Sequence, residues 1–108
     1  MPLATLEIKK ELIPYSFKFT KDGLAYDFAI RYNAEHDFFT MDLGINEEWV
    51  ILGEKINYGR PLFANFEHFP TPKHIIPLDP ASSVSRVGYR ELQNTVKLFI
   101  LEQADETV

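Results

Sequence analysis

Large apolar residues alternate with polar ones over a long stretch in the first half of the chain, and this alternation constrains the fold most strongly. A period of two places successive side chains on opposite faces of a strand, so one face is buried. Asp22 and Gly23 interrupt the pattern as a two-residue hairpin turn, because both positions of such a turn favour positive φ. A tight turn there sets Phe19 opposite Tyr26. The pattern predicts a three-stranded antiparallel meander at about residues 16–43.

The register of the second hairpin follows from the same alternation. Setting Ile30 opposite Phe39 leaves residues 33–36 as a four-residue loop and keeps the apolar side chains of all three strands on one face. This register also places Asp27 opposite Asp42, which is a mildly unfavourable like-charge pair. The predicted core face consists of Phe17, Phe19, Tyr26, Phe28, Ile30, Phe39, Met41 and Leu43.

The rest of the chain adds short strands and little helix. Alternation predicts a first strand near residues 4–10, and a polar turn at 44–48 leads to a compact strand at 49–52. A candidate strand lies at 73–76, and the β-branched and aromatic run at 95–101 predicts a closing strand. The fold class expected is therefore all-β, as a small antiparallel β-barrel or sandwich built on the meander plus a closing C-terminal strand.

We expect one domain over residues 1–108, because a chain of this length can bury a core without a disulfide. Prolines punctuate an irregular loop at about 67–90, and an acidic tail at 103–108 is expected to fray. A long irregular connection in a small domain is often functional or ordered by a partner.

Charge and composition exclude several classes of partner. The net charge is −5 and Lys and Arg do not cluster, which argues against a nucleic-acid surface. The absence of cysteine excludes thiol catalysis and Cys-type zinc sites, and it fits assembly in a reducing cytosol. No apolar run approaches the roughly 18–20 residues of a membrane span, and the N-terminus does not resemble a signal peptide. We expect neither nucleic-acid binding nor membrane insertion, and synthesis inside a cell.

Motifs that carry chemistry are missing from the sequence. His36, His68 and His74 lack the spacing of a zinc site, and there is no nucleophile elbow or phosphate-binding glycine loop. A small hydrolase would instead need two carboxyl groups at a set separation in a cleft, and the candidates are Asp37, Asp42, Glu47, Glu48 and Glu54. The residues predict no enzyme, no metal and no cofactor.

Three aromatic residues keep a second class of function open. Trp49, Tyr58 and Tyr15 are candidates for an aromatic sugar-binding platform, although burial explains them equally well. The alternative function is thus a stand-alone ligand- or carbohydrate-binding β-module.

An ordered series of hairpin residues resembles one known family. The series reads Ile13-Pro14-Tyr15-Ser16-Phe17, then Gly23-Leu24-Ala25-Tyr26-Asp27-Phe28-Ala29-Ile30-Arg31-Tyr32-Asn33, then Phe39-Thr40-Met41-Asp42-Leu43. It continues through Gly53 and Gly59-Arg60-Pro61-Leu62-Phe63 to the apolar run at 96–101. In these features the chain resembles the phage baseplate plug family, small structural proteins of contractile-tail phage and prophage baseplates. The resemblance covers about residues 12–101.

Membership in such a family implies a structural role in the virion tail baseplate, after synthesis in the bacterial host cytoplasm. It implies a central plug where tail tube, hub and spike proteins meet, without catalysis or cofactor. For partner contact we single out side chains in or near the Pro-rich region, which offers little scaffold to bury them: Arg60, Phe63, Phe66, Phe69, His74, Arg86 and Tyr89. The alternative for the three phenylalanines is that they cap an open end of the barrel.

Overall fold

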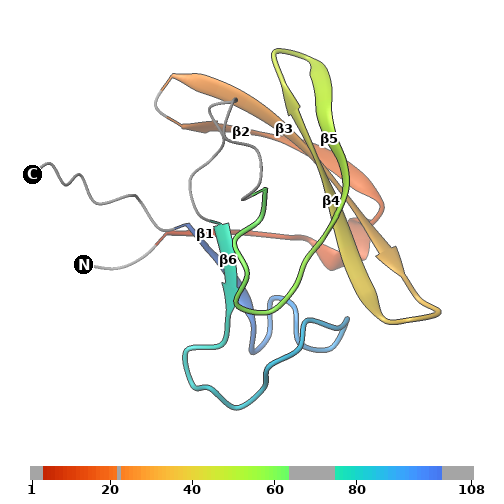
Figure 1. The fold of residues 1–108 in the computed structure, drawn as a ribbon, viewed down its shortest axis with the longest axis vertical. Coiled ribbons are helices and arrows are strands. Elements are labelled where there is room, and N and C mark those ends of the chain that lie inside the picture. Colours follow the sequence, from red (N-terminus) through yellow and green to blue (C-terminus); the bar gives the residue numbers. More distant parts are fainter. Residues whose placement is uncertain (1–3, 22, 64–74, 101–108) are drawn as a thin grey trace, which may run out of the picture.

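The computed structural model describes residues 4–21, 23–63 and 75–100, which form two antiparallel sheets (Figure 1). The larger sheet contains four strands in chain order: β2 (Tyr15–Lys21), β3 (Leu24–Asn33), β4 (Phe38–Ile45) and β5 (Glu48–Lys55). The expected meander is therefore confirmed and gains β5 as a fourth strand.

The second sheet brings the two ends of the described chain together. Its strands are β1 (Ala4–Leu6), β6 (Ile75–Leu78) and β7 (Lys97–Ile100), with β7 in the middle. A short 3-10 helix, η1 (Lys10–Leu12), connects β1 to β2. Two separate sheets make the sandwich alternative correct, and the expected C-terminal closing strand is confirmed as β7.

One apolar core lies between the two sheets. Phe28, Ile30, Met41 and Leu43 have no measurable exposure, and the half-buried Phe17 and Phe19 of edge strand β2 pack against them. The other sheet contributes Leu6, Ile75, Leu98 and Ile100 to the same cluster. All eight residues of the predicted core face therefore lie on the buried side of the meander.

The first hairpin has the predicted register, whereas the second is displaced by two residues. Ile30 pairs with Met41, and Tyr32 pairs with Phe39. The displacement arises in the turn: β3 continues to Asn33, whose Oδ1 accepts a hydrogen bond of 3.0 Å from the His36 amide. Since two is the period of the strand, the buried face is unchanged.

The corrected register also removes the predicted pairing of Asp27 with Asp42. Asp27 lies opposite Gly44, and its carboxylate pairs with Lys18 at 2.8 Å. Asp42 is 1% exposed and pairs with Arg31 at 3.0 Å. Each acid therefore has a cation on the neighbouring strand, which offsets the cost of its burial.

The remaining strand boundaries differ from the predictions by a few residues. The turn between β4 and β5 is only Asn46 and Glu47, both at positive φ, so the strands extend into the predicted 44–48 turn. The first strand is shorter than 4–10, and β6 extends two residues beyond the predicted 73–76, of which residues 73 and 74 lie outside the described part of the chain. Part of the Pro-rich stretch is therefore strand, while the acidic tail at 103–108 lies outside the described residues.

Candidate interaction surface

Asp37, at the end of the β3–β4 turn, is the centre of a polar network that joins distant parts of the chain. Its Oδ1 accepts hydrogen bonds from the Tyr32 hydroxyl at 2.6 Å and the Tyr89 amide at 2.8 Å. Its Oδ2 accepts one from Arg86 Nη2 at 2.7 Å. Asp37 has φ of 57°, a left-handed conformation that Asp tolerates better than most residues. The network attaches the tip of the larger sheet to the segment that precedes β7.

The hydrogen bonds keep the Asp37 carboxylate ionised at neutral pH. Donation from Tyr32, then from the Tyr89 amide and Arg86, lowers the pKa of Asp37 to about 2. The same bond to Asp37 raises the pKa of Tyr32, and the contact with Asp37 raises that of Arg86. Asp37 therefore serves as a fixed acceptor and is poorly suited to proton transfer near neutral pH.

Glycine is required where the segment passes Asp37. A Cβ at Gly88 would collide with Asp37 Oδ2 and would lie 2.8 Å from Glu91 Oε1. Glu91 in turn accepts hydrogen bonds from the Gly88 amide at 3.0 Å and from Arg86 Nη1 at 3.3 Å. Arg86 is thus held between two carboxylates, and a larger residue at 88 would separate them.

Tyr89 adds an exposed aromatic ring to the network. It is 43% exposed and packs edge-on against Tyr32, with the ring centroids 5.1 Å apart. Lys10 from η1 lies 4.8 Å above the Tyr89 ring and donates a hydrogen bond to the Tyr89 carbonyl oxygen at 2.6 Å. Three segments far apart in sequence therefore meet here: η1, the β3–β4 turn and residues 86–91.

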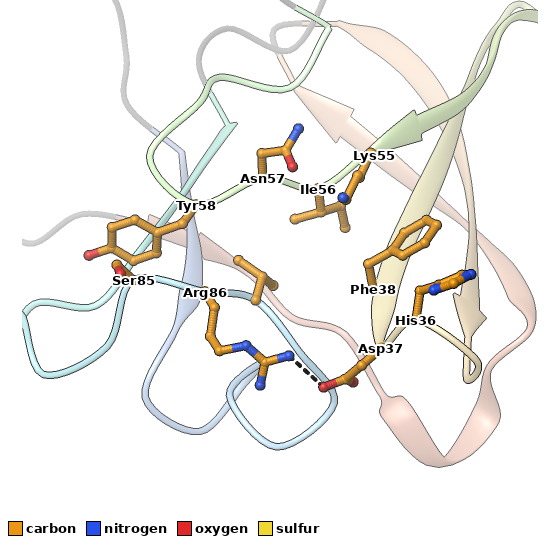
Figure 2. A pocket seen from close by; sticks show the side chains of 10 residues that line it. His36, Asp37, Phe38, Lys55, Ile56, Asn57, Tyr58, Ser85 and Arg86 are labelled. Carbon is orange, nitrogen blue, oxygen red and sulfur yellow. Dashed lines mark hydrogen bonds and ion pairs between the residues drawn. The ribbon is translucent and has the colours of Figure 1, made fainter.

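A polar pocket of about 290 Å³ opens beside this network. Figure 2 shows Phe38 and Tyr58 on opposite sides of it, with Arg86 extending between them to Asp37. Lys55 Nζ lies 4.6 Å above the Phe38 ring. A second hollow shares Asp37 and Arg86, and it adds Tyr89 and Arg90 to the lining. We call the whole region the Arg86 surface; it comprises Tyr32, Asp37, Lys55, Arg86, Tyr89 and Arg90.

The predicted contact residues fall into three groups. Arg86 and Tyr89 lie together on the Arg86 surface, and Arg60 is exposed elsewhere. Phe63 is 1% exposed and stacks on Phe28 with centroids 6.1 Å apart, so its ring belongs to the core. Phe66, Phe69 and His74 lie outside the described residues.

Residue patterns missed the partners of Arg86. The sequence pattern marks Asp37 only as a candidate hydrolase carboxylate, and it assigns no site role to Lys10, Tyr32 or Lys55. Arg86 and Asp37 are 49 positions apart, so no local spacing connects them. The isolated glycine at position 88 is the one available signal, since a glycine permits a close backbone approach.

The other candidate carboxylates and aromatics do not converge. Asp42 Oδ1 accepts a hydrogen bond from the Gly53 amide, and Glu54 Oε2 accepts one from the Phe63 amide. Trp49 lies over Gly44, whereas the Tyr58 hydroxyl accepts a hydrogen bond from the Asp79 amide. Tyr15 stacks on Phe17 beside the core, so the three aromatics predicted as a sugar platform have separate neighbours.

Within the described part of the chain, no helix is long and apolar enough to cross a membrane. The same residues contain no group of three His, Cys, Asp or Glu side chains that could hold a metal ion.

Comparison with known proteins gives one match. A family model described as cyanophage baseplate Pam3 plug gp18 matches residues 3–103. No curated protein and no solved structure matches the chain significantly.

Proposed function

The chain belongs to the cyanophage baseplate plug family, and from this premise we propose that it binds tube, hub and spike proteins at the central axis of a contractile tail baseplate. It acts there as a structural subunit and catalyses no reaction. It reaches the virion tail after synthesis in the cytoplasm of the bacterial host.

The Arg86 surface is the observation that supports partner binding most directly. Three chain segments converge on it and are held by charge-assisted hydrogen bonds, which are among the strong ones in proteins. Tyr89 and Arg90 nevertheless remain exposed there. Arginine and tyrosine are enriched at protein interfaces, and preorganised side chains lose less entropy on binding.

A structural role also fits the state of the acidic side chains. Asp37 and Asp42 are both in ion pairs with arginine. The pKa of Asp37 is lowered to about 2, so this carboxylate is not poised to exchange a proton near neutral pH. Of the residues predicted to contact partners, Arg60, Arg86 and Tyr89 are exposed and remain our proposed contacts. Phe66, Phe69 and His74 remain predictions.

The test uses the tube, hub and spike proteins encoded beside this chain, purified and immobilised one at a time. Lys55→Gln removes one positive charge from the Arg86 surface, and we expect it to weaken binding to at least one of them about tenfold. Lys97→Gln is the matched control, because Lys97 is exposed on β7. Equal binding by the two variants would contradict this use of the surface, and no binding by the unmodified chain would contradict the proposed function.

A further inference from the structure

A row of four paired residues crosses the outer face of the four-stranded sheet. Lys18 on β2 lies opposite Asp27 on β3, Asp27 opposite Gly44 on β4, and Gly44 opposite Trp49 on β5. These positions alternate with core residues such as Phe28, so they point away from the core. Trp49 lies near the start of β5 and Lys55 at its end, so the row is separate from the Arg86 surface.

Gly44 has no side chain, and the Trp49 ring packs over its backbone. A Cβ at position 44 would lie 3.1 Å from Trp49 Cε3 and 3.2 Å from the Asp27 Cβ. The ring therefore fills the space that a side chain at 44 would take, and it reaches the neighbourhood of Asp27. Because Trp49 is still 47% exposed, one side of a positioned aromatic ring is open to solvent.

The charge around the ring is negative. Asp27 Oδ1 pairs with Lys18 at 2.8 Å, and no described residue donates a hydrogen bond to Asp27 Oδ2. Glu47 is exposed in the turn that leads into β5, and it forms no ion pair with a described residue. Two carboxylates, those of Asp27 and Glu47, therefore stand near the Lys18 ammonium group.

We propose that this row binds an arginine side chain presented by another protein. The guanidinium stacks on the open side of Trp49, donates to Asp27 Oδ2, and is attracted by Glu47. Tryptophan is the best aromatic partner for a cation. A planar guanidinium can stack on the ring and donate in its own plane at the same time, whereas a lysine ammonium can satisfy only one of these contacts fully. Only the idea that the arginine belongs to a tail protein rests on the proposed function.

The experiment uses Trp49 itself as the reporter, because it is the one tryptophan in the sequence. The full chain is titrated, at low salt to limit screening, with a blocked Gly-Arg-Gly-Arg-Gly peptide and with the same peptide carrying citrulline in place of arginine. Citrulline keeps the planar shape and removes the charge. We expect a saturable change in Trp49 emission with the arginine peptide and binding at least about fivefold weaker with the citrulline peptide.

Two variants test the geometry. Asp27→Asn should weaken the arginine peptide about five- to tenfold, whereas Glu35→Gln, which removes one charge from the exposed β3–β4 turn, should change binding less than about twofold. Gly44→Ala keeps every charge and should weaken binding by displacing the ring. Equal affinity for the two peptides, no response to either, or equal effects of Asp27→Asn and Glu35→Gln would overturn the proposal.

The peptide comparison uses the unmodified chain, so it remains decisive if a variant proves unstable. It is also independent of the tail-protein assay with Lys55→Gln. If the unmodified chain binds tail proteins but does not bind the arginine peptide, the arginine site is contradicted and the proposed function is not. If the chain binds the arginine peptide but no tail protein, the proposed function is contradicted and the arginine site is not.

Discussion

Phe28→Ala tests most directly whether this face of the meander forms the core. The Phe28 ring is fully buried and lies at the centre of an aromatic cluster. Its centroid is 5.6 Å from that of Phe17, 6.0 Å from Phe19 and 6.1 Å from Phe63. Truncation therefore removes contacts within the meander and with the segment that follows β5.

The expected cost can be worked out from this environment. Truncation of a buried phenylalanine costs about 3–5 kcal/mol, because the lost transfer free energy is increased by the cavity that remains. Each lost aromatic pair is worth about 0.5–1.5 kcal/mol beyond its buried area, which favours the upper part of that range. For a domain of this size the melting temperature should fall by roughly 12–20 °C.

The assay is urea unfolding followed by circular dichroism, with the free energy of unfolding extrapolated to water. Phe38→Ala is the matched control, because Phe38 is half-buried beside Lys55 and Ile56 at the rim of the pocket; it should cost roughly half as much or less. Should Phe28→Ala fail to fold, Phe28→Leu should still lose about 1–2 kcal/mol. A loss below about 1 kcal/mol for Phe28→Ala would show that this face of the meander is not the core.

Three further predictions concern single sites. The pKa of Asp37 is about 2 in the folded chain against an ordinary 3.8. Its contribution to stability is therefore complete above about pH 4 and is lost as the pH falls towards 2. In urea unfolding, the free energy of unfolding of Asp37→Asn should fall less steeply with decreasing pH than that of the unmodified chain. Gly53→Ala should cost about 1 kcal/mol through its φ of 74° alone, since a Cβ there meets nothing within 4 Å, and a neutral result in urea unfolding would argue against that backbone conformation. Asp79 accepts hydrogen bonds from the amides of Ala81, Ser83 and Val84, so Asp79→Ala should accelerate hydrogen exchange at these three amides and leave exchange in β3 unchanged.

Alternation was sufficient to assign the faces of the meander, because the assignment depends only on whether a position is odd or even. It could not choose between registers that differ by two residues, since both bury the same side chains. Two side-chain hydrogen bonds at the turn stabilise the observed register. Asn33 accepts one from the His36 amide, and Asp37 accepts one from the Tyr32 hydroxyl. Such bonds depend on side-chain geometry that a pattern of polar and apolar residues does not carry.

The Arg86 surface was still less accessible to sequence reasoning. The sequence points to Arg86 and Tyr89 because their region offers little scaffold, but their position depends on Asp37 and on Lys10, which come from two other parts of the chain. Phe63 shows the opposite case. It was grouped with the Pro-rich region, yet its ring is buried against Phe28. Contacts between residues distant in sequence determine where Arg86, Tyr89 and Phe63 lie. These contacts follow from the packing of the two sheets.

The position of β7 between β1 and β6 has a consequence for synthesis on the ribosome. Strands β2 to β5 pair with their neighbours in sequence, so that sheet can assemble early. Among the described strands β1 pairs only with β7, so its backbone stays unpaired until residues 97–100 have been translated. The nascent chain is therefore prone to aggregation before β7 emerges, and slowing translation of the codons for β7 should lower the soluble yield.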